Sequence, residues 1–373
     1  MRLKVFINYI IFVFSLIIIL ILLSNLSVLY NSVDDDRTRM ESLYKEKNNH
    51  LDVIVLGPSS TFCSWTPIYA WQEYGMTSHT YAFGHLHVAA YKYAIKEFLK
   101  TQKPKLIILY TDAFKDDEMQ AKDYILYHKF LIFMKFSKNK IAMINAISDE
   151  SNLDIFQRAE LYFPIIRYHS KWKLLFDLPR IEKFYKCVVT YFLSFQEGED
   201  IPILKHKDVF VDNQQYNNIS KEKIEIINDL FIYLKKLNIP VLMTNFPEVK
   251  HYSDASSYVK QIQRNRLIFK MAKDMGFDTI NLIDFDIIEK MGIKNKNYVD
   301  ECHFNYVGTY KYTKYLGAFI QKKYNIENKK NDIDYNDWDE EYFKYYNYVK
   351  KHHNIDIDKE LNFNSVNENN YLM

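Results

Sequence analysis

The sequence predicts an α/β fold built on a parallel sheet of about five strands, preceded by a membrane-spanning helix. Three features support this: short apolar runs rich in β-branched residues, amphipathic segments between them, and a long apolar N-terminus. Strands that alternate with helices are typical of a parallel sheet covered on both faces. At 373 residues the chain is long enough for one large domain or two small ones. We expect one core with insertions.

Five runs are predicted as strands, of which the last two named are weaker: 51–56, 105–110, 239–244, 81–83 and 279–283. The first run ends at Gly57 and Pro58, which mark a turn. Pro240 cannot donate to a ladder, so it belongs at the start of its strand.

Two amphipathic segments are expected to pack on this sheet as helices. One follows Ser220, a suitable N-cap, and the other follows Asn305. In both, apolar residues recur at the spacing of one helical face: Ile224, Ile227, Phe231 and Leu234 in the first, and Tyr312, Tyr315, Leu316, Phe319 and Ile320 in the second.

The remaining regions set the expected domain boundaries. Residues 31–50 are polar and are expected to form a linker or a short helix, and residues 51–323 are expected to form the α/β domain. Residues 115–214 interrupt the alternation of strands and helices and are expected to form a helical insertion. Residues 324–373 are expected to form a polar tail with a peripheral helix and a disordered end.

Residues 1–30 are expected to anchor the chain in a membrane. Helical residues 5–30 would exceed a hydrocarbon core of about 30 Å. A cleaved signal peptide is the alternative, but it would end in small residues, whereas residues 28–30 are bulky. Arg2 and Lys4 precede the span and acidic residues follow it, which predicts a single-pass cell-membrane protein with its domain outside the cytoplasm.

The overall composition argues against several classes of protein. Lys and Arg number 49 against 47 Asp and Glu, so there is no field to attract nucleic acid. Cys63, Cys187 and Cys302 lie far apart and imply neither a disulfide scaffold nor a thiolate zinc site. No cofactor is expected.

A serine follows the first predicted strand, at the edge of a parallel sheet where sites form. Ser59 stands in the turn after Gly57 and Pro58. It could be a nucleophile, or Ser59 or Ser60 could cap the next helix. A nucleophilic serine needs a histidine base oriented by a carboxylate, and Asp300 and His303 together offer both.

These residues resemble motifs of the SGNH/GDSL hydrolase family. That family has Gly-x-Ser after its first strand, a glycine after its second and Asp-x-x-His near its C-terminus, which Gly57 to Ser59, Gly84, and Asp300 to His303 match. The resemblance covers about residues 51–323, and it implies a flavodoxin-like sheet of the SGNH type. It also implies that Ser59 is the nucleophile, His303 the acid and base, and Asp300 its orienter. The backbone N–H groups of Ser59 and Gly84 would bind the oxyanion.

The third family motif is different in this chain. The family has Gly-x-Asn-Asp after its third strand, whereas this chain has Tyr110-Thr111-Asp112-Ala113. An ionised Asp112 only accepts hydrogen bonds, so the expected oxyanion hole lacks one donor.

Two other features have alternative interpretations. His85 and His87 could ligate a metal or shape the site, and we expect no metal there because a third ligand is not evident. The basic and aromatic segment 163–172 could bind sugars or anionic polymer, or it could be an ordinary amphipathic helix.

The resemblance is closest to membrane-anchored members that act on acyl groups of envelope glycans or teichoic acids. It implies a serine esterase or acyltransferase acting on O-acyl groups of such a polymer. Expected partners are the membrane, the acylated polymer and a membrane acyl-transfer protein, without nucleic acid. The alternative is a non-catalytic protein of the same fold that binds a component of an envelope acyl-transfer system.

Overall fold

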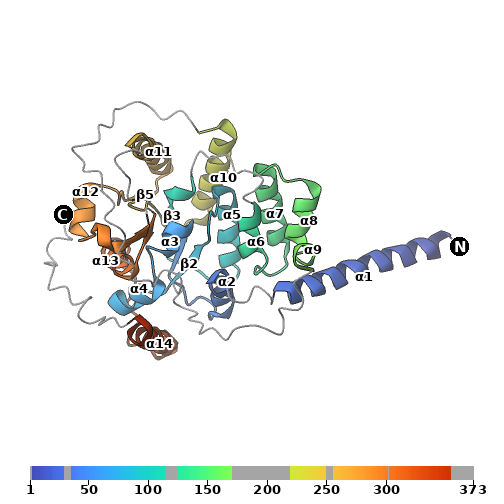
Figure 1. Ribbon diagram of the computed structural model, residues 1–373, viewed down its shortest axis with the longest axis horizontal. Helices are drawn as coiled ribbons and strands as arrows, with labels where there is room; N and C mark the ends of the chain where they lie inside the picture. Colours follow the sequence, from blue (N-terminus) through green and yellow to red (C-terminus); the bar gives the residue numbers. More distant parts are fainter. Residues whose placement is uncertain are drawn as a thin grey trace. The chain divides into compact units, whose positions relative to one another are not determined.

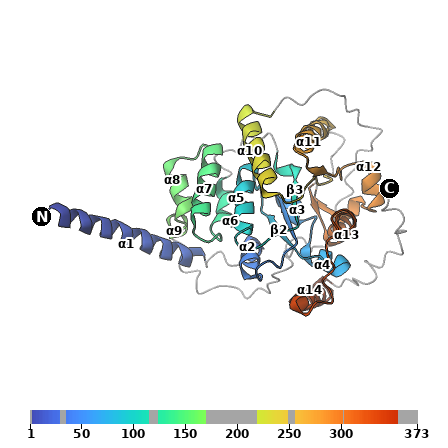
Figure 2. The same cartoon turned by 180° about the vertical axis from the view of Figure 1, so that it is seen from behind.

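The computed structural model describes residues 2–28, 35–114, 124–169, 219–248, 255–300 and 302–353. The chain divides into two compact units, whose elements Figures 1 and 2 show from opposite sides. Unit 1 consists of Met1–Glu41 and Glu118–Lys183, and unit 2 consists of Ser42–Asp117 and Phe184–Met373.

Unit 2 contains a five-stranded sheet in which every neighbouring pair of strands is parallel. The strand order is β2-β1-β3-β4-β5, the order of flavodoxin-like doubly wound sheets. The strands are β1 (Val53–Gly57), β2 (Ser78–Ala82), β3 (Leu106–Tyr110), β4 (Val241–Thr244) and β5 (Asp278–Thr279). The predicted α/β class with five parallel strands is confirmed.

All five strands differ from their predicted limits by at least one residue, and β2 and β5 differ most. β2 begins at Ser78, because polar residues from Ser78 to Thr80 are buried there and pair with β1. β5 is only two residues long, because a side chain replaces the ladder beyond it: Asn245 Oδ1 accepts from Leu282 N at 2.7 Å. β4 begins at Val241, so Pro240 lies directly before the strand, where no N–H group is needed for the ladder.

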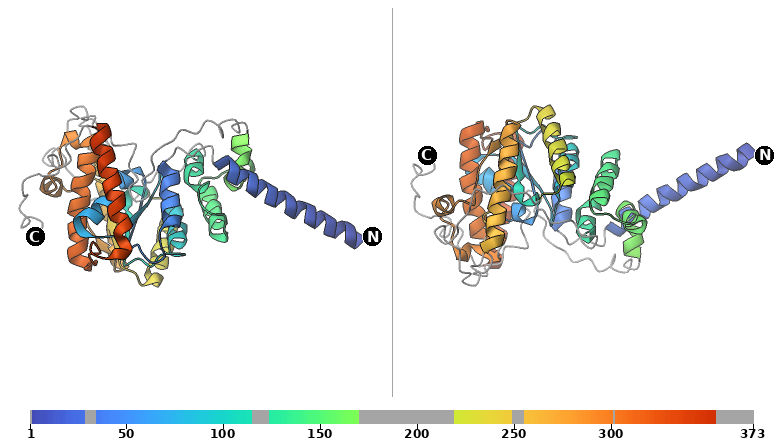
Figure 3. Two further views of the ribbon diagram at one scale, coloured as in Figure 1. Left: turned by 90° about the horizontal axis from the view of Figure 1, so that it is seen from below. Right: turned by 90° about the horizontal axis from the view of Figure 1, so that it is seen from above.

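Helices cover both faces of the sheet (Figure 3). On one face, Val55 and Ile108 belong to a core cluster with residues of α4 (Pro67–Tyr74) and α13 (Tyr306–Tyr324). The alternate strand residues Ile54 and Ile107 point to the other face and are also fully buried. There α5 (Val88–Phe98) packs against α10 (Lys221–Leu237).

The predicted caps of two of these helices are confirmed. Ser220 accepts a hydrogen bond from Lys223 N at the start of α10. Asn305 does the same for Gly308 N at the start of α13. The other elements of unit 2 are α3 (Ser59–Phe62), α11 (Ala255–Asp274), α12 (Phe285–Lys290), α14 (Asn336–His353), the strands β6 (Tyr298–Asp300) and β7 (His303–Phe304), and 3₁₀ turns at Thr111–Ala113, Asn295–Asn297 and Ile333–Tyr335.

Within the predicted polar tail, α14 packs against α4. Trp338 and Tyr345 are buried, and Asp339 accepts a hydrogen bond from Trp71 Nε1 at 2.8 Å. Residues 354–373, where a disordered end was expected, lie outside the described residues.

Unit 1 contains the apolar helix α1 (Arg2–Val28), and residues Leu3–Ser24 are long and apolar enough to cross a membrane. The helical part of the predicted insertion comprises α6 (Tyr124–Leu131), α7 (Lys138–Glu150), α8 (Ile155–Tyr162) and α9 (Ile165–Tyr168). Of these, α9 contacts α1. The helix α2 (Asp35–Lys45) lies in the expected linker. Residues 29–34, 115–123 and 170–214, which belong to the predicted anchor, linker and insertion, lie outside the described residues.

Candidate functional site

The turn after β1 is tightly packed, and it places Ser59 at the carboxyl edge of the sheet. A Cβ on Gly57 would lie 1.7 Å from Thr61 Oγ1 and 3.0 Å from Tyr110 Cβ, so only glycine fits without displacing its neighbours. The N-cap residue of α3 is Pro58, and no side chain caps this helix. The alternative in which Ser59 or Ser60 is a helix cap is therefore wrong.

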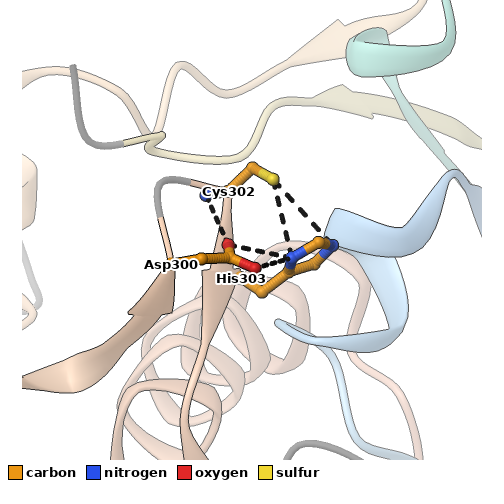
Figure 4. A group of neighbouring side chains, drawn as sticks. All are labelled: Asp300, Cys302 and His303. Atoms are coloured by element: carbon orange, nitrogen blue, oxygen red, sulfur yellow. Dashed lines mark hydrogen bonds and ion pairs between the residues drawn. The ribbon is translucent and has the colours of Figure 1, made fainter. Parts of the chain in front are cut away.

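A short antiparallel hairpin brings Asp300 and His303 together. Asp300 in β6 lies opposite His303 in β7, so their side chains form a cross-strand pair. His303 Nδ1 lies 2.8 Å from Asp300 Oδ2 and 2.9 Å from Oδ1. Asp300 Oδ1 also accepts a hydrogen bond from Cys302 N at 2.9 Å. Figure 4 shows the imidazole and the carboxylate facing each other.

The same imidazole reaches the serine after β1. His303 Nε2 lies 2.9 Å from Ser59 Oγ, although the two residues are 244 positions apart in sequence. With Nδ1–H donated to Asp300, the lone pair on Nε2 can accept the Ser59 proton. Ser59, His303 and Asp300 thus form one hydrogen-bonded series in which the histidine can act as a base.

The carboxylate of this series is ionised at neutral pH and reaches solvent. Partial burial raises the pKa of Asp300, but hydrogen bonds from His303 and Cys302 outweigh it and hold this pKa below its ordinary value. The Asp300 side chain is 49% exposed and that of His303 is 15% exposed. A solute can therefore approach the imidazole from outside.

Aromatic packing anchors the hairpin to the sheet. The Phe304 ring lies 4.6 Å from that of Phe246, which follows β4. The Tyr298 hydroxyl donates to the Pro247 carbonyl at 2.6 Å. A Cβ on Gly308 would lie 2.4 Å from the Asn297 carbonyl oxygen, so this glycine lets α13 pack closely against the hairpin.

Two buried threonines fasten α13 to the segment that follows Ser59. Thr309 Oγ1 donates to the Cys63 carbonyl at 2.6 Å, and Thr313 Oγ1 donates to the Ser64 carbonyl at 2.9 Å. These bonds fix the serine and histidine segments relative to each other. Neither threonine was predicted from the sequence, although polar residues four apart beside the apolar face of a helix were the available signal.

Gly84 lies near the same edge, two residues beyond Ala82, the β2 residue that pairs with Gly57. A Cβ on Gly84 would meet no atom within 4 Å, so packing does not require glycine there. The adjacent His85 is exposed and has a left-handed backbone with φ of 57°.

His87 is buried and accepts a hydrogen bond from Ala89 N through Nδ1, which caps α5. Burial, assisted by the positive charge of Lys223, lowers the pKa of His87 to about 3. Among the described residues, no group of three metal-ligating side chains includes His85 or His87. In that part of the chain such a group occurs at Asp300, Cys302 and His303.

Asp112 follows β3 in a 3₁₀ turn and is buried. Its Oδ2 accepts a hydrogen bond from Phe246 N at 3.1 Å. The carboxylate thus links the ends of β3 and β4, and it acts as an acceptor at the position where the family motif has an amide donor.

The segment 163–172 is described only in part. Ile165–Tyr168 forms α9, in unit 1. Residues 170–172, which include the basic Lys171 and the aromatic Trp172 of this segment, lie outside the described residues. The sugar-binding interpretation stays a prediction.

Comparison of the chain with models of known protein families, with curated proteins and with solved structures gives no match in any of the three.

Proposed function

We propose that this chain is a membrane-anchored serine esterase or acyltransferase of the SGNH type. We further propose that it acts on O-acyl groups of a cell-envelope polysaccharide or teichoic-acid-like polymer. The observation that carries the proposal is the 2.9 Å separation of Ser59 Oγ and His303 Nε2, with Asp300 on the other imidazole nitrogen. A hydroxyl, a base and an orienting carboxylate in this sequence of contacts are what nucleophilic acyl transfer requires.

In the proposed reaction His303 Nε2 takes the Ser59 proton as Oγ attacks the acyl carbonyl carbon. The negative charge that develops on the carbonyl oxygen is bound by the backbone N–H groups of Ser59 and Gly84. As the first residue of α3, Ser59 has an N–H group without a partner inside its helix. His303 then protonates the polymer oxygen of the breaking ester bond, which leaves as a hydroxyl, and the acyl group stays on Ser59.

The second half of the reaction restores the serine. Water or a second polymer hydroxyl loses its proton to His303 and attacks the acyl-serine carbonyl carbon. His303 returns a proton to Ser59 Oγ as the bond from the acyl carbon to Oγ breaks, which yields hydrolysis or transfer. The N-terminal helix α1 has the length and composition to hold this chemistry at a membrane surface. The positive-inside rule predicts that the domain lies outside the cytoplasm, where envelope polymers are found.

A fluorophosphonate probe on the full chain in detergent tests the proposal, because it reacts with activated serines. Labelling should occur in the wild type and disappear in Ser59→Ala and His303→Ala. Ser60→Ala is the matched control, since the Ser60 hydroxyl is buried next to the site and has no hydrogen-bond partner among the described residues. No labelling of the folded wild type would refute an activated serine.

The contact of Asp112 with Phe246 N favours a second candidate, a non-catalytic protein that binds an envelope acyl-transfer component. A buried acceptor in place of the third oxyanion donor weakens an enzyme but not a binding protein. This candidate predicts that the wild type does not react with the fluorophosphonate probe. It also predicts that the wild type is retained on acylated envelope polymer and is released when mild base removes the acyl groups. An enzyme would instead deacylate the polymer.

A further inference from the structure

The hairpin that carries His303 also carries a thiol that the proposed reaction does not use. Cys302 directly precedes His303 in the sequence, and Asp300 is two residues before it. Cys302 is partly exposed and forms no disulfide. Figure 4 shows its sulfur above the imidazole ring, on the side of the Asp300 carboxylate. One potential ligand atom from each of the three residues lies within 4.8 Å of the other two.

The separations of these atoms approach those of a tetrahedral zinc site. Zinc bonds of about 2.0–2.3 Å at tetrahedral angles place ligand atoms about 3.3–3.6 Å apart. The 3.5 Å between Cys302 Sγ and His303 Nδ1 is within that range, but Sγ also lies 4.0 Å from Nε2, over the ring, so the thiol must turn toward the Nδ1 lone pair to share a metal with it. The Asp300 oxygens lie 2.8 and 2.9 Å from Nδ1, which is closer than two ligands of one zinc ion lie to each other. The carboxylate must therefore move away from Nδ1 by about half an ångström. Its 49% exposed side chain has room to do so.

The types of ligand narrow the choice of cation. A thiolate and an imidazole prefer zinc and its chemical relatives, whereas magnesium and calcium take oxygen ligands. Three protein ligands leave one tetrahedral position for water.

We propose that Asp300, Cys302 and His303 Nδ1 bind one zinc-class divalent cation, and that this cation reversibly switches off the serine site. Binding breaks the hydrogen bond between Asp300 and His303 and releases the Cys302 thiol proton to solvent. With its Nδ1 lone pair on the metal, the neutral imidazole carries its proton on Nε2. It then donates to Ser59 Oγ and cannot accept the serine proton. This inhibitory step rests on the proposed function, whereas the binding of the metal does not.

Cobalt titration of the full chain in detergent tests the binding directly, because a thiolate bound to Co²⁺ gives a charge-transfer absorption in the near ultraviolet. The wild type and Cys187→Ser, the matched cysteine control, should give this band at one Co²⁺ per chain, and Zn²⁺ should displace it. Cys302→Ser should not give the band. A wild type without the band, or a band that survives in Cys302→Ser, would overturn the site.

The rate of fluorophosphonate labelling, with and without Zn²⁺, tests the inhibition. Zn²⁺ should slow labelling of the wild type at least tenfold and a chelator should restore it, while the ratio in Cys302→Ser should stay near one. If Zn²⁺ leaves the labelling rate of the wild type unchanged, the proposed inhibition is wrong. A Co²⁺ band in a chain that is never labelled would keep the metal site and refute the proposed esterase instead.

Discussion

The ends of β1 and β3 lie side by side in the sheet but differ in chemistry. After β1, the Ser59 hydroxyl meets an imidazole that is itself bonded to a carboxylate. After β3, the Asp112 carboxylate is buried and accepts a bond from Phe246 N. The first arrangement can activate a nucleophile, and the second stabilises a loop. The difference teaches that a serine, a base and a carboxylate can meet at one strand end while the neighbouring strand end presents a buried acceptor.

Removing the proposed nucleophile or the proposed base should have the largest effect on catalysis. Ser59→Ala and His303→Ala should each lower the rate of ester cleavage by about 10⁴–10⁶-fold, because neither group acts alone. The double variant should be no slower than the slower single variant. Initial rates with a chromogenic acetate ester measure this, and additive losses would show that the two residues do not work as a unit.

Replacing the carboxylate of the series should cost less. Asp300→Asn keeps a polar side chain of the same size but stabilises the protonated imidazole less well, and we expect kcat to fall by about 10²–10⁴-fold. The thermal midpoint should change little, since the Asp300 side chain is 49% exposed. If kcat is unchanged, Asp300 does not orient His303 during turnover.

Adding a hydrogen-bond donor at the end of β3 should raise the rate, whereas the two preceding changes lower it. In Asp112→Asn the amide oxygen can still accept from Phe246 N, and the amide N–H adds a donor. We expect kcat to rise by about tenfold, less than the 10²–10³ that a well-placed oxyanion donor provides in one protease. Asp112→Ala, which lacks both groups, is the control. Equal rates in Asp112→Asn and Asp112→Ala would exclude an oxyanion role for this position.

The smallest effect on catalysis is expected at His87, which caps α5 and lies outside the proposed site. Its replacement should instead change how folding stability depends on pH. Its pKa is about 3 in the folded chain against 6.5 ordinarily, so the unfolded state binds more protons between these values. Folding stability should therefore fall as pH drops below 6.5, by about 2 kcal/mol at pH 5. His87→Asn keeps a capping side chain and should flatten this loss in urea unfolding at several pH values. A pH slope that His87→Asn leaves unchanged would contradict this prediction.

Much of the fold could be predicted because burial on both faces leaves a clear pattern in a parallel strand. The runs that became β1 and β3 are almost wholly apolar, and Ser220 and Asn305 cap their helices as predicted. The limits of β2 and β5 could not be predicted. The polar residues that begin β2 resemble a loop in sequence, and β5 is cut short by a distant side chain, that of Asn245.

The site was predictable where its residues follow strand ends or lie close in sequence. Ser59 follows a recognisable strand, and Asp300 and His303 are three positions apart. The β6–β7 hairpin that pairs those two was missed, because its strands of three and two residues are too short to show alternation. The contacts of Thr309 with Cys63 and of Phe246 with Asp112 join distant segments, and no local pattern marks such contacts.

The 244 positions between Ser59 and His303 also order events during biosynthesis. At about 5–20 residues per second, the ribosome adds the histidine roughly 10–50 s after the serine. Until then the serine is an ordinary hydroxyl, and a chain that terminates early never acquires its base. Reactivity at Ser59 would therefore report that translation has passed the β6–β7 hairpin and that α13 has docked.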